Sequence, residues 1–227
     1  MGLSSLAAVV MFVMLFLIPV FLESVQGLTP LQAGLALLPQ GLVTGLGTVL
    51  GEKLPAKYGL RRSVAVGMGI LTLSTAALLL VDSDTPGWLV PTILSGRGLA
   101  LGLTIQPLLP AMLGGLVPAE MADATVLFNV AQWVGGSIGI SLLATFFKVR
   151  EQAHVGAVLP RFGVPAHNPL AGSAENAVAM PVTVQHALGK AATAGFHDVI
   201  ALLVVLAAVG TAAALLLGNR GQRSLQE

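Results

Sequence analysis

Six long apolar stretches, separated by charged or turn-forming residues, dominate this sequence of 227 residues. A membrane hydrocarbon core of ~30 Å requires about 20 consecutive apolar residues in a helix, and the stretches reach about that length. They are apolar on every face, whereas the strands of a membrane β-barrel alternate apolar and polar residues. The sequence therefore predicts an all-α polytopic membrane protein with six transmembrane helices. We expect these at about residues 3–22, 31–50, 63–81, 88–116, 124–147 and 199–217.

The composition excludes several functional classes. Only 9% of the residues are charged, against about 25% in a soluble domain, so the chain cannot cover a water-facing surface. The eleven Lys and Arg residues form no cluster that would bind nucleic acid. No convergent set of acid, base or nucleophile groups indicates an enzyme.

No metal site or cofactor is predicted. The chain has no cysteine, which excludes disulfides, thiolate zinc sites and iron–sulfur centres. Its four histidines are separated by 13, 19 and 11 residues, which fits no metal-ligand spacing. They are His154, His167, His186 and His197.

The distribution of basic residues predicts the topology. Four Lys or Arg residues lie in the connection 51–62, and two more follow the sixth stretch, whereas connections 23–30 and 82–87 carry only acids. Because cytoplasmic loops are enriched in Lys and Arg, we expect both termini in the cytoplasm and the chain in the cell (inner) membrane, surrounded by lipid. Residues 1–147 then contain five spans, 148–198 a long periplasmic or extracellular loop, 199–217 the sixth span and 218–227 a cytoplasmic tail.

Large polar side chains are confined to some of the spans. Such groups are costly in lipid and normally face the interior of a bundle or a water-filled cavity. Spans three and six contain only Ser and Thr, so we expect them outside, with spans one, two, four and five around a cavity. The candidate substrate-cavity residues are Gln40, Arg97, Gln106, Asn129 and Gln132.

Arg97 is the strongest of these candidates. It lies nine residues after Trp88, about 13 Å into the membrane at 1.5 Å per residue. Its guanidinium either bonds carbonyls of a neighbouring helix and fixes the packing, or it is a cavity charge that meets substrate. The side-chain amides of Gln106, Asn129 and Gln132 either form hydrogen bonds between helices or contact a ligand. Gln40 follows Pro39, where a kink frees backbone carbonyls, so its amide either bonds locally or contacts a ligand. No acid lies in the middle of a span, which argues against proton coupling by this chain alone.

Glycine pairs four residues apart predict close helix packing, because small residues let helix backbones approach each other. The pairs are Gly41/Gly45, Gly47/Gly51, Gly98/Gly102 and Gly135/Gly139.

Several motifs resemble one transporter family. Residues 17–39 (LIPVFLESVQGLTPLQAGLALLP) resemble the start of the C-terminal half of fourteen-span drug:proton antiporters of the major facilitator superfamily. Residues 96–107 (GRGLALGLTIQP) resemble its RGxGxG helix, and residues 129–139 (NVAQWVGGSIG) its NxxRQxGGxxG helix. The connection 54–61 (LPAKYGLR) is similar to a cytoplasmic loop of the superfamily. The residues of that loop motif are Lys57, Gly59, Arg61 and Arg62.

The resemblance implies one half of a major-facilitator fold, from a multidrug-efflux transporter that exports hydrophobic or cationic small molecules by proton antiport. Transport in that superfamily rocks two halves about a central site, so a separate N-terminal half or a second copy would be the partner. The alternative is a truncated fragment without function. The chain departs from the family pattern at Glu23 (usually Gln), Ala56 (Asp) and Ala131 (Arg), and residues 98–102 lack the middle Gly.

Overall fold

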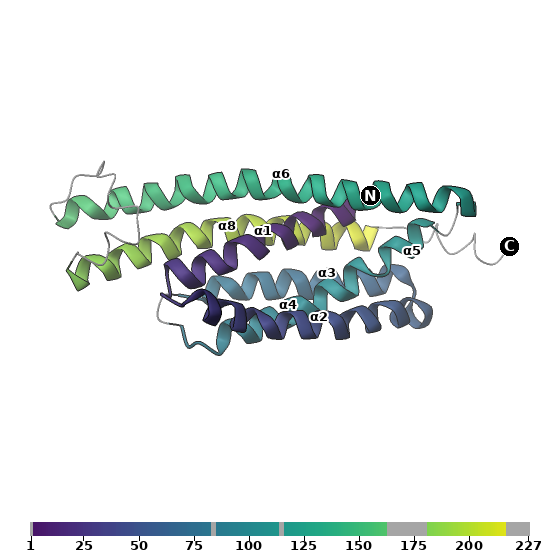
Figure 1. The fold of residues 1–227 in the computed structure, drawn as a ribbon, viewed down its shortest axis with the longest axis horizontal. Helices are drawn as coiled ribbons and strands as arrows, with labels where there is room; N and C mark the ends of the chain where they lie inside the picture. The colour runs from purple at the N-terminus through teal and green to yellow at the C-terminus, as the bar shows by residue number, and fades with distance from the viewer. Residues whose placement is uncertain (1, 83–84, 114–115, 163–180, 217–227) are drawn as a thin grey trace.

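The structure is a computed structural model, and it describes residues 2–82, 85–113, 116–162 and 181–216. All elements of this described part are helical, which confirms the expected all-α class (Figure 1). They are α1 (Gly2–Ser24), α2 (Pro30–Tyr58), α3 (Leu60–Ala77), η1 (Leu78–Leu80), α4 (Leu89–Ile105), α5 (Leu108–Leu113), α6 (Pro118–Val158), η2 (Leu159–Phe162) and α8 (Val182–Leu216).

Five of these helices are long and apolar enough to cross a membrane: α1, α2, α3 with η1, α6 and α8. The fourth predicted span differs, because it does not continue as one helix to residue 116. Helix α4 has 17 residues and ends at Ile105, and the short helix α5 follows from Leu108. Pro107 lies between them, and proline lacks the amide hydrogen that would continue a helix.

The basic connection predicted at 51–62 is almost entirely helical. Helix α2 runs through it to Tyr58, and α3 begins at Leu60. Gly59 alone separates them, with a φ of 83° and an amide that donates to the Pro55 carbonyl at 2.9 Å. A positive φ is tolerated by glycine, which has no Cβ, so one residue makes the sharp turn.

Most described residues of the connection predicted at 148–198 are helical. Helix α6 continues to Val158 and η2 to Phe162, and α8 begins at Val182; residues 163–180 lie outside the described part, as does the predicted tail 218–227. With 41 and 35 residues, α6 and α8 are about 60 and 50 Å long at 1.5 Å per residue, well beyond a ~30 Å hydrocarbon core. Together they extend past the other helices at one end of the bundle (Figure 1).

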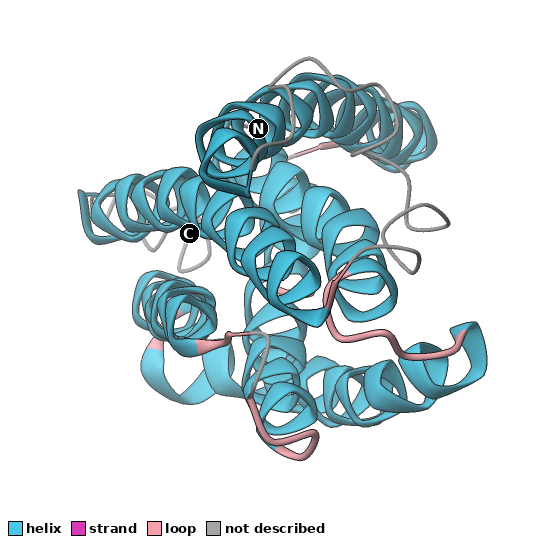
Figure 2. Ribbon diagram, turned by 90° about the vertical axis from the view of Figure 1, so that its left-hand side faces the viewer, coloured by secondary structure: helices cyan, strands magenta, loops and turns pink. Residues whose placement is uncertain are grey.

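The helices form two layers. Helices α1, α6 and α8 lie on one side and α2, α3 and α4 on the other (Figure 1), and the end view shows the layers stacked (Figure 2). Helix α2 packs on α4, α4 on α3, and α6 on both α1 and α8, while α3 and α8 join the layers. Contacts of α1 with α2 and α4 are sparser, so the layers are separated by a seam along this side.

The centre of the bundle is formed by apolar packing between α1 and α8. A polar contact between α3 and α8 lies there as well. Phe21 of α1 stacks on Phe196 of α8 with ring centroids 4.2 Å apart, and both side chains are buried. The hydroxyls of Thr72 on α3 and Thr211 on α8 are 3.0 Å apart, which ties the layers with a hydrogen bond.

The most continuous exposed apolar faces lie on α2 and α6, whereas we expected α3 and α8 to be the outer helices. The exposed residues include Leu31, Leu35, Leu38, Leu42 and Leu46 of α2, and Val126, Val130, Trp133, Ile138 and Leu142 of α6. Within this chain, α3 and α8 instead bury one face against each other and expose the other.

Candidate functional site

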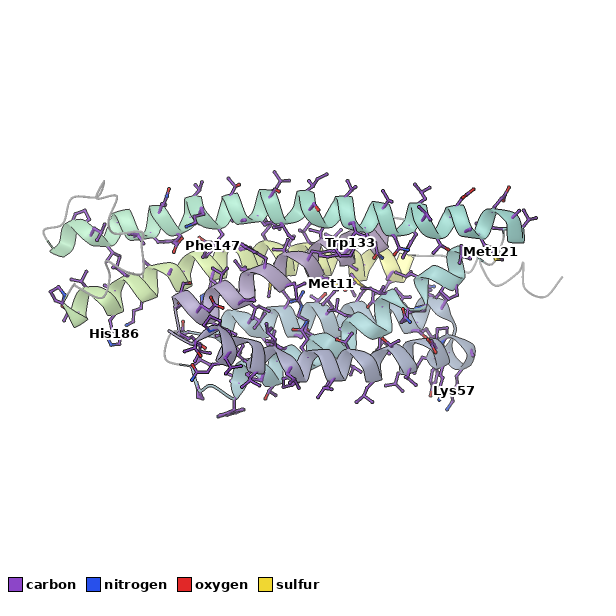
Figure 3. The ribbon with its side chains drawn as sticks, viewed as in Figure 1. Met11, Lys57, Met121, Trp133, Phe147 and His186 are labelled. Carbon is purple, nitrogen blue, oxygen red and sulfur yellow. The ribbon has the colours of Figure 1, made fainter. Side chains whose placement is uncertain are left out.

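A groove of about 400 Å³ lies in the seam between α1, α2 and α4. Met11 is on its α1 side, at the boundary between the layers (Figure 3). It brings together two of the predicted cavity residues, Gln40 of α2 and Gln106 at the end of α4. The full lining is Met11, Leu15, Leu37, Gln40, Gly41, Thr44, Thr48, Leu101, Gly102, Ile105 and Gln106.

Glycines bring α2 and α4 close enough to form the floor of this groove. A Cβ at Gly47 would lie 2.7 Å from the Leu99 carbonyl oxygen, and one at Gly51 would lie 2.5 Å from that of Gly102. A Cβ at Gly98 would overlap the Gln40 carbonyl. The predicted close packing is therefore present at these positions, which accept no larger residue without moving a backbone. At Gly41, Gly45 and Gly135 it is not, because a Cβ there would meet no described atom within 4 Å.

The groove is mainly apolar, with a few side-chain amides. The Thr44 hydroxyl donates to the Gln40 carbonyl at 2.8 Å and the Thr48 hydroxyl to the Thr44 carbonyl at 3.0 Å. The side-chain Oε1 of Gln40 is buried and accepts no hydrogen bond from the described residues. Because a buried polar atom without a partner costs free energy, Gln40 can accept a hydrogen bond from a ligand or a water here.

Arg97 lies deep beside the groove rather than in its wall. Its side chain is 1% exposed, and Nη2 donates a 2.6 Å hydrogen bond to the backbone carbonyl of Val10 on α1. This bond crosses the seam between the layers. The Nε atom is buried without a partner among the described residues, so part of the guanidinium's hydrogen-bonding capacity is unused.

The two α6 candidates are not among the lining residues of the groove. Asn129 is exposed, and its Nδ2 donates to the Thr125 carbonyl of its own helix at 3.0 Å. Gln132 is half-buried, and its Nε2 is buried without a partner among the described residues. Helix α6 instead contacts α1 through Gly139, where a Cβ would lie 2.8 Å from Val9 Cγ1.

The residues of the cytoplasmic-loop motif surround the turn at Gly59. Lys57, Arg61 and Arg62 are exposed, and Lys57 lies at the end of the bundle opposite the α6–α8 extension (Figure 3). Its Nζ is 5.3 Å from the centroid of the Tyr58 ring. The three cations thus present positive charge at one end of α2 and α3.

A polar cluster that was not predicted joins α6 and α8 near the other end. The Asp198 carboxylate accepts from Arg150 Nε at 2.7 Å and contacts His154 Nε2 at 2.9 Å. Arg150 lowers the pKa of the Asp198 carboxyl, because both the hydrogen bond and the charge favour the ionised form. His154 is therefore one of the contacts between α6 and α8. In the described part, no group of three His, Cys, Asp or Glu side chains could hold a metal.

Sequence reasoning missed the two threonines of the groove. Gln40, Thr44 and Thr48 are spaced four residues apart, which places them on one face of a helix. That spacing is present in the sequence, but a Thr hydroxyl in a helix can bond the carbonyl four residues earlier, as both do here, so the spacing alone does not indicate a ligand site.

The match with known proteins decides the family. The family model of the Major Facilitator Superfamily matches residues 1–140 of this chain. That range includes every lining residue of the groove. The chain belongs to the Major Facilitator Superfamily. This membership supports a membrane transport protein rather than an enzyme.

Curated members of the superfamily are similar over much of this chain. The uncharacterized MFS-type transporter YhcA of Bacillus subtilis is 28% identical over 150 residues, covering 66% of this chain and 28% of the relative. A multidrug resistance protein B homolog of Mycobacterium tuberculosis is 27% identical over 198 residues, covering 86% and 36%. A tetracycline resistance determinant of Streptomyces rimosus is 32% identical over 127 residues, covering 56% and 37%. The matched regions thus span roughly a quarter to a third of each relative.

Proposed function

We propose that this chain is one half of a drug-efflux transporter of the superfamily, in the cell (inner) membrane with both termini cytoplasmic. The complete transporter would export small hydrophobic or cationic molecules by proton antiport. The observation that supports this most is the mainly apolar groove between α1, α2 and α4, with the buried, unpartnered Oε1 of Gln40 and the amide of Gln106. Such a surface binds apolar molecules by shape and orients them with few hydrogen bonds.

The names of the relatives favour drugs as the substrate class. Two of the three are named for multidrug or tetracycline resistance. At 27–32% identity the specific drug does not transfer, so we propose only the class.

A second half is the proposed partner, either a separately encoded N-terminal half or a second copy. The groove lies in the seam between the two layers of helices. Its lining residues include no acid that could carry a proton. The exposed apolar faces of α2 and α6 offer the packing surface for that half. A Cβ at Gly45 of α2 would meet no described atom within 4 Å, so this small residue leaves room for a neighbouring helix to approach.

Co-expression tests the proposal. The chain is expressed alone, with a second tagged copy of itself, and with the segment of the M. tuberculosis relative that precedes its matched region. Efflux of a fluorescent hydrophobic cation from cells is measured with and without a protonophore. We expect export only when two halves are present, and loss of export on addition of the protonophore.

Variants assign the export to the groove. Gln40→Leu should reduce export because it removes the unpartnered acceptor, whereas Gln152→Leu, at an exposed site on the α6 extension, should not. Absence of export from every combination would support a non-functional fragment instead. Equal export by both variants would exclude Gln40 from the binding surface.

A further inference from the structure

Four basic residues lie on the two sides of the one-residue turn at Gly59, and we call this group the basic turn. Lys53 and Lys57 belong to the end of α2, and Arg61 and Arg62 to the first turn of α3. All four side chains are exposed. In Figure 3, Lys57 marks this end of the bundle, opposite the α6–α8 extension. The proposed transport function gives these side chains no role.

The charge of the basic turn is not neutralised by acids of the described residues. The ion pairs there join Asp198 to Arg150 and His154, and neither includes a residue of the basic turn. The connection 51–62 contains one acid, Glu52, which is exposed and lies about 100° around α2 from Lys53. With four cations against one acid, the connection has a net charge of +3.

The two lysines continue an exposed apolar stripe of α2. Leu42, Leu46 and Leu50 are 67%, 64% and 43% exposed. Residues 42, 46, 50, 53 and 57 follow one another at steps of three or four, which places them on one face of a helix. An apolar face of α2 that is open in this chain therefore ends on two cations.

Helix α3 repeats this arrangement on the other side of the turn. Val66 and Leu73 are 52% and 72% exposed, and they follow Arg62 by four and eleven residues, which again is one face of a helix. Helices α2 and α3 are neighbours. Each of them thus presents an open apolar stripe that ends on a cation at the same end of the bundle.

The spacing along the helices places the cations at the level of lipid headgroups when the stripes lie in hydrocarbon. At 1.5 Å per residue, Lys53 lies about 4.5 Å beyond Leu50 along α2, and Arg62 about 6 Å beyond Val66 along α3. The headgroup layer adds about 5–8 Å to each side of the hydrocarbon core. Lysine and arginine side chains are long enough to adjust their height further.

We propose that the basic turn binds an anionic phospholipid surface. The lipid phosphates contact the four basic side chains, and the acyl chains lie along the stripes of α2 and α3. Basic clusters next to a membrane span attract anionic lipids, and charged donors form strong hydrogen bonds to phosphate. The proposed second half has room to approach at Gly45, about 100° around α2 from Leu46, so both contacts can form.

Lipid selection by the intact chain tests this surface. The purified protein is incubated in mixed micelles with equal amounts of phosphatidylglycerol and phosphatidylcholine of identical acyl chains and washed, and the retained lipids are counted by mass spectrometry. We expect about fivefold more phosphatidylglycerol, the ratio that one cation near an anionic lipid gives. The preference should weaken in about 1 M salt, where the Debye length shortens to about 3 Å. Equal retention at low salt, or a preference that salt does not weaken, would overturn the proposal.

Variants of the basic turn locate the selected lipid. The pair Lys53→Gln and Lys57→Gln and the pair Arg61→Gln and Arg62→Gln should each lower the ratio, and all four replacements together should abolish the preference. Glu52→Gln should raise the ratio, because it removes the acid of this connection. Loss of folding cannot produce such an increase. An unchanged ratio after all four replacements, or a decrease in Glu52→Gln, would contradict the proposed surface.

A matched control removes two cations elsewhere. Lys148 and Lys190 are exposed on α6 and α8, toward the end of the bundle that carries the extension (Figure 1). Replacement of both by Gln should leave the ratio unchanged. A decrease as large as that of the Lys53 and Lys57 pair would show that net charge, and not the basic turn, selects the lipid.

Soluble phosphate distinguishes a lipid surface from a site for small anions. Glycerol 3-phosphate has no acyl chains, so at the concentration of the lipid it should not displace phosphatidylglycerol. Displacement at that concentration would overturn the lipid assignment and indicate a site for soluble phosphates. None of these measurements requires transport, so their outcome is independent of the proposed efflux function.

Discussion

Arg97 Nη2 on α4 donates a 2.6 Å hydrogen bond to the backbone carbonyl of Val10 on α1. The bond connects the two layers beside the groove, where contacts of α1 with α2 and α4 are otherwise sparse. It matches the first of the two arrangements expected for this arginine, a guanidinium bonded to a neighbouring helix.

Replacement of Arg97 by Met should loosen α1 from α4. The apolar stem is kept, but the bond to Val10 is lost. Spin labels on Phe16→Cys and Thr92→Cys, exposed positions on α1 and α4, report the distance distribution between the helices. We expect this distribution to broaden in Arg97→Met and to stay unchanged in Lys57→Met; equal widths in both would show that Arg97 does not tie these helices.

Gly47→Ala should destabilise the fold, whereas Gly45→Ala should not. The new Cβ at Gly47 would lie 2.7 Å from the Leu99 carbonyl oxygen, while that at Gly45 would meet no described atom within 4 Å. Overpacking of this kind costs about 1–3 kcal/mol, and alanine in an open helical position favours the helix. Thermal unfolding in detergent gives the two values, and an equal decrease in Tm for both would refute the close approach of α2 and α4.

Asp198→Asn should separate the extended parts of α6 and α8. The pKa of the Asp198 carboxyl is lowered by Arg150, so its stabilising contribution is complete above the ordinary aspartate pKa of about 3.9. The contribution is lost only as the pH falls through the lowered pKa.

Amide hydrogen exchange of residues 148–158 checks this prediction. Because Asp198 stays ionised at both values, the native segment should be protected at about pH 5 as well as at about pH 8, after correction for the intrinsic exchange rate. Protection should decrease in Asp198→Asn at both pH values and stay native in Asp123→Asn, an exposed acid near the other end of α6. Unchanged protection in Asp198→Asn would show that the cluster does not hold the extension.

The α6–α8 extension and the turn at Gly59 should lie on opposite sides of the membrane. The chain has no native cysteine, so single cysteines can be labelled without background. Gln152→Cys should react with an impermeant maleimide in intact cells, and Lys57→Cys only after permeabilisation. The reverse pattern would invert the predicted topology.

Apolar patterning located five of the six predicted spans as long apolar helices of the described part, but not their ends. Residues 124–147 lie within α6, yet α6 continues for eleven residues to Val158. Hydropathy detects the part of a helix that lies in lipid and is silent on a helix that continues into water. The same reason explains the missed start of α8 and the helical residues on both sides of Gly59.

The candidate site was predictable only in part. The cost of polar groups in lipid predicts Gln40 and Gln106 as cavity residues, and both line one groove. The same argument predicts Asn129 and Gln132, which are not in the lining of that groove. Polarity identifies which side chains require a partner, while the packing of α6 against α1 decides which of them face a common space.

The sequence by itself determined that the chain is a helical membrane protein, where its apolar spans lie and which of its polar residues lie within them. These properties follow from the free energy of transferring each side chain from water to lipid. That free energy depends on the residue type and on which residues are its neighbours in the sequence. The tertiary structure alone decided that Arg97 donates a hydrogen bond to Val10 and that Asp198 joins α6 to α8. Each of these arrangements joins residues far apart in the chain, and their contact depends on how the helices are rotated and spaced against one another.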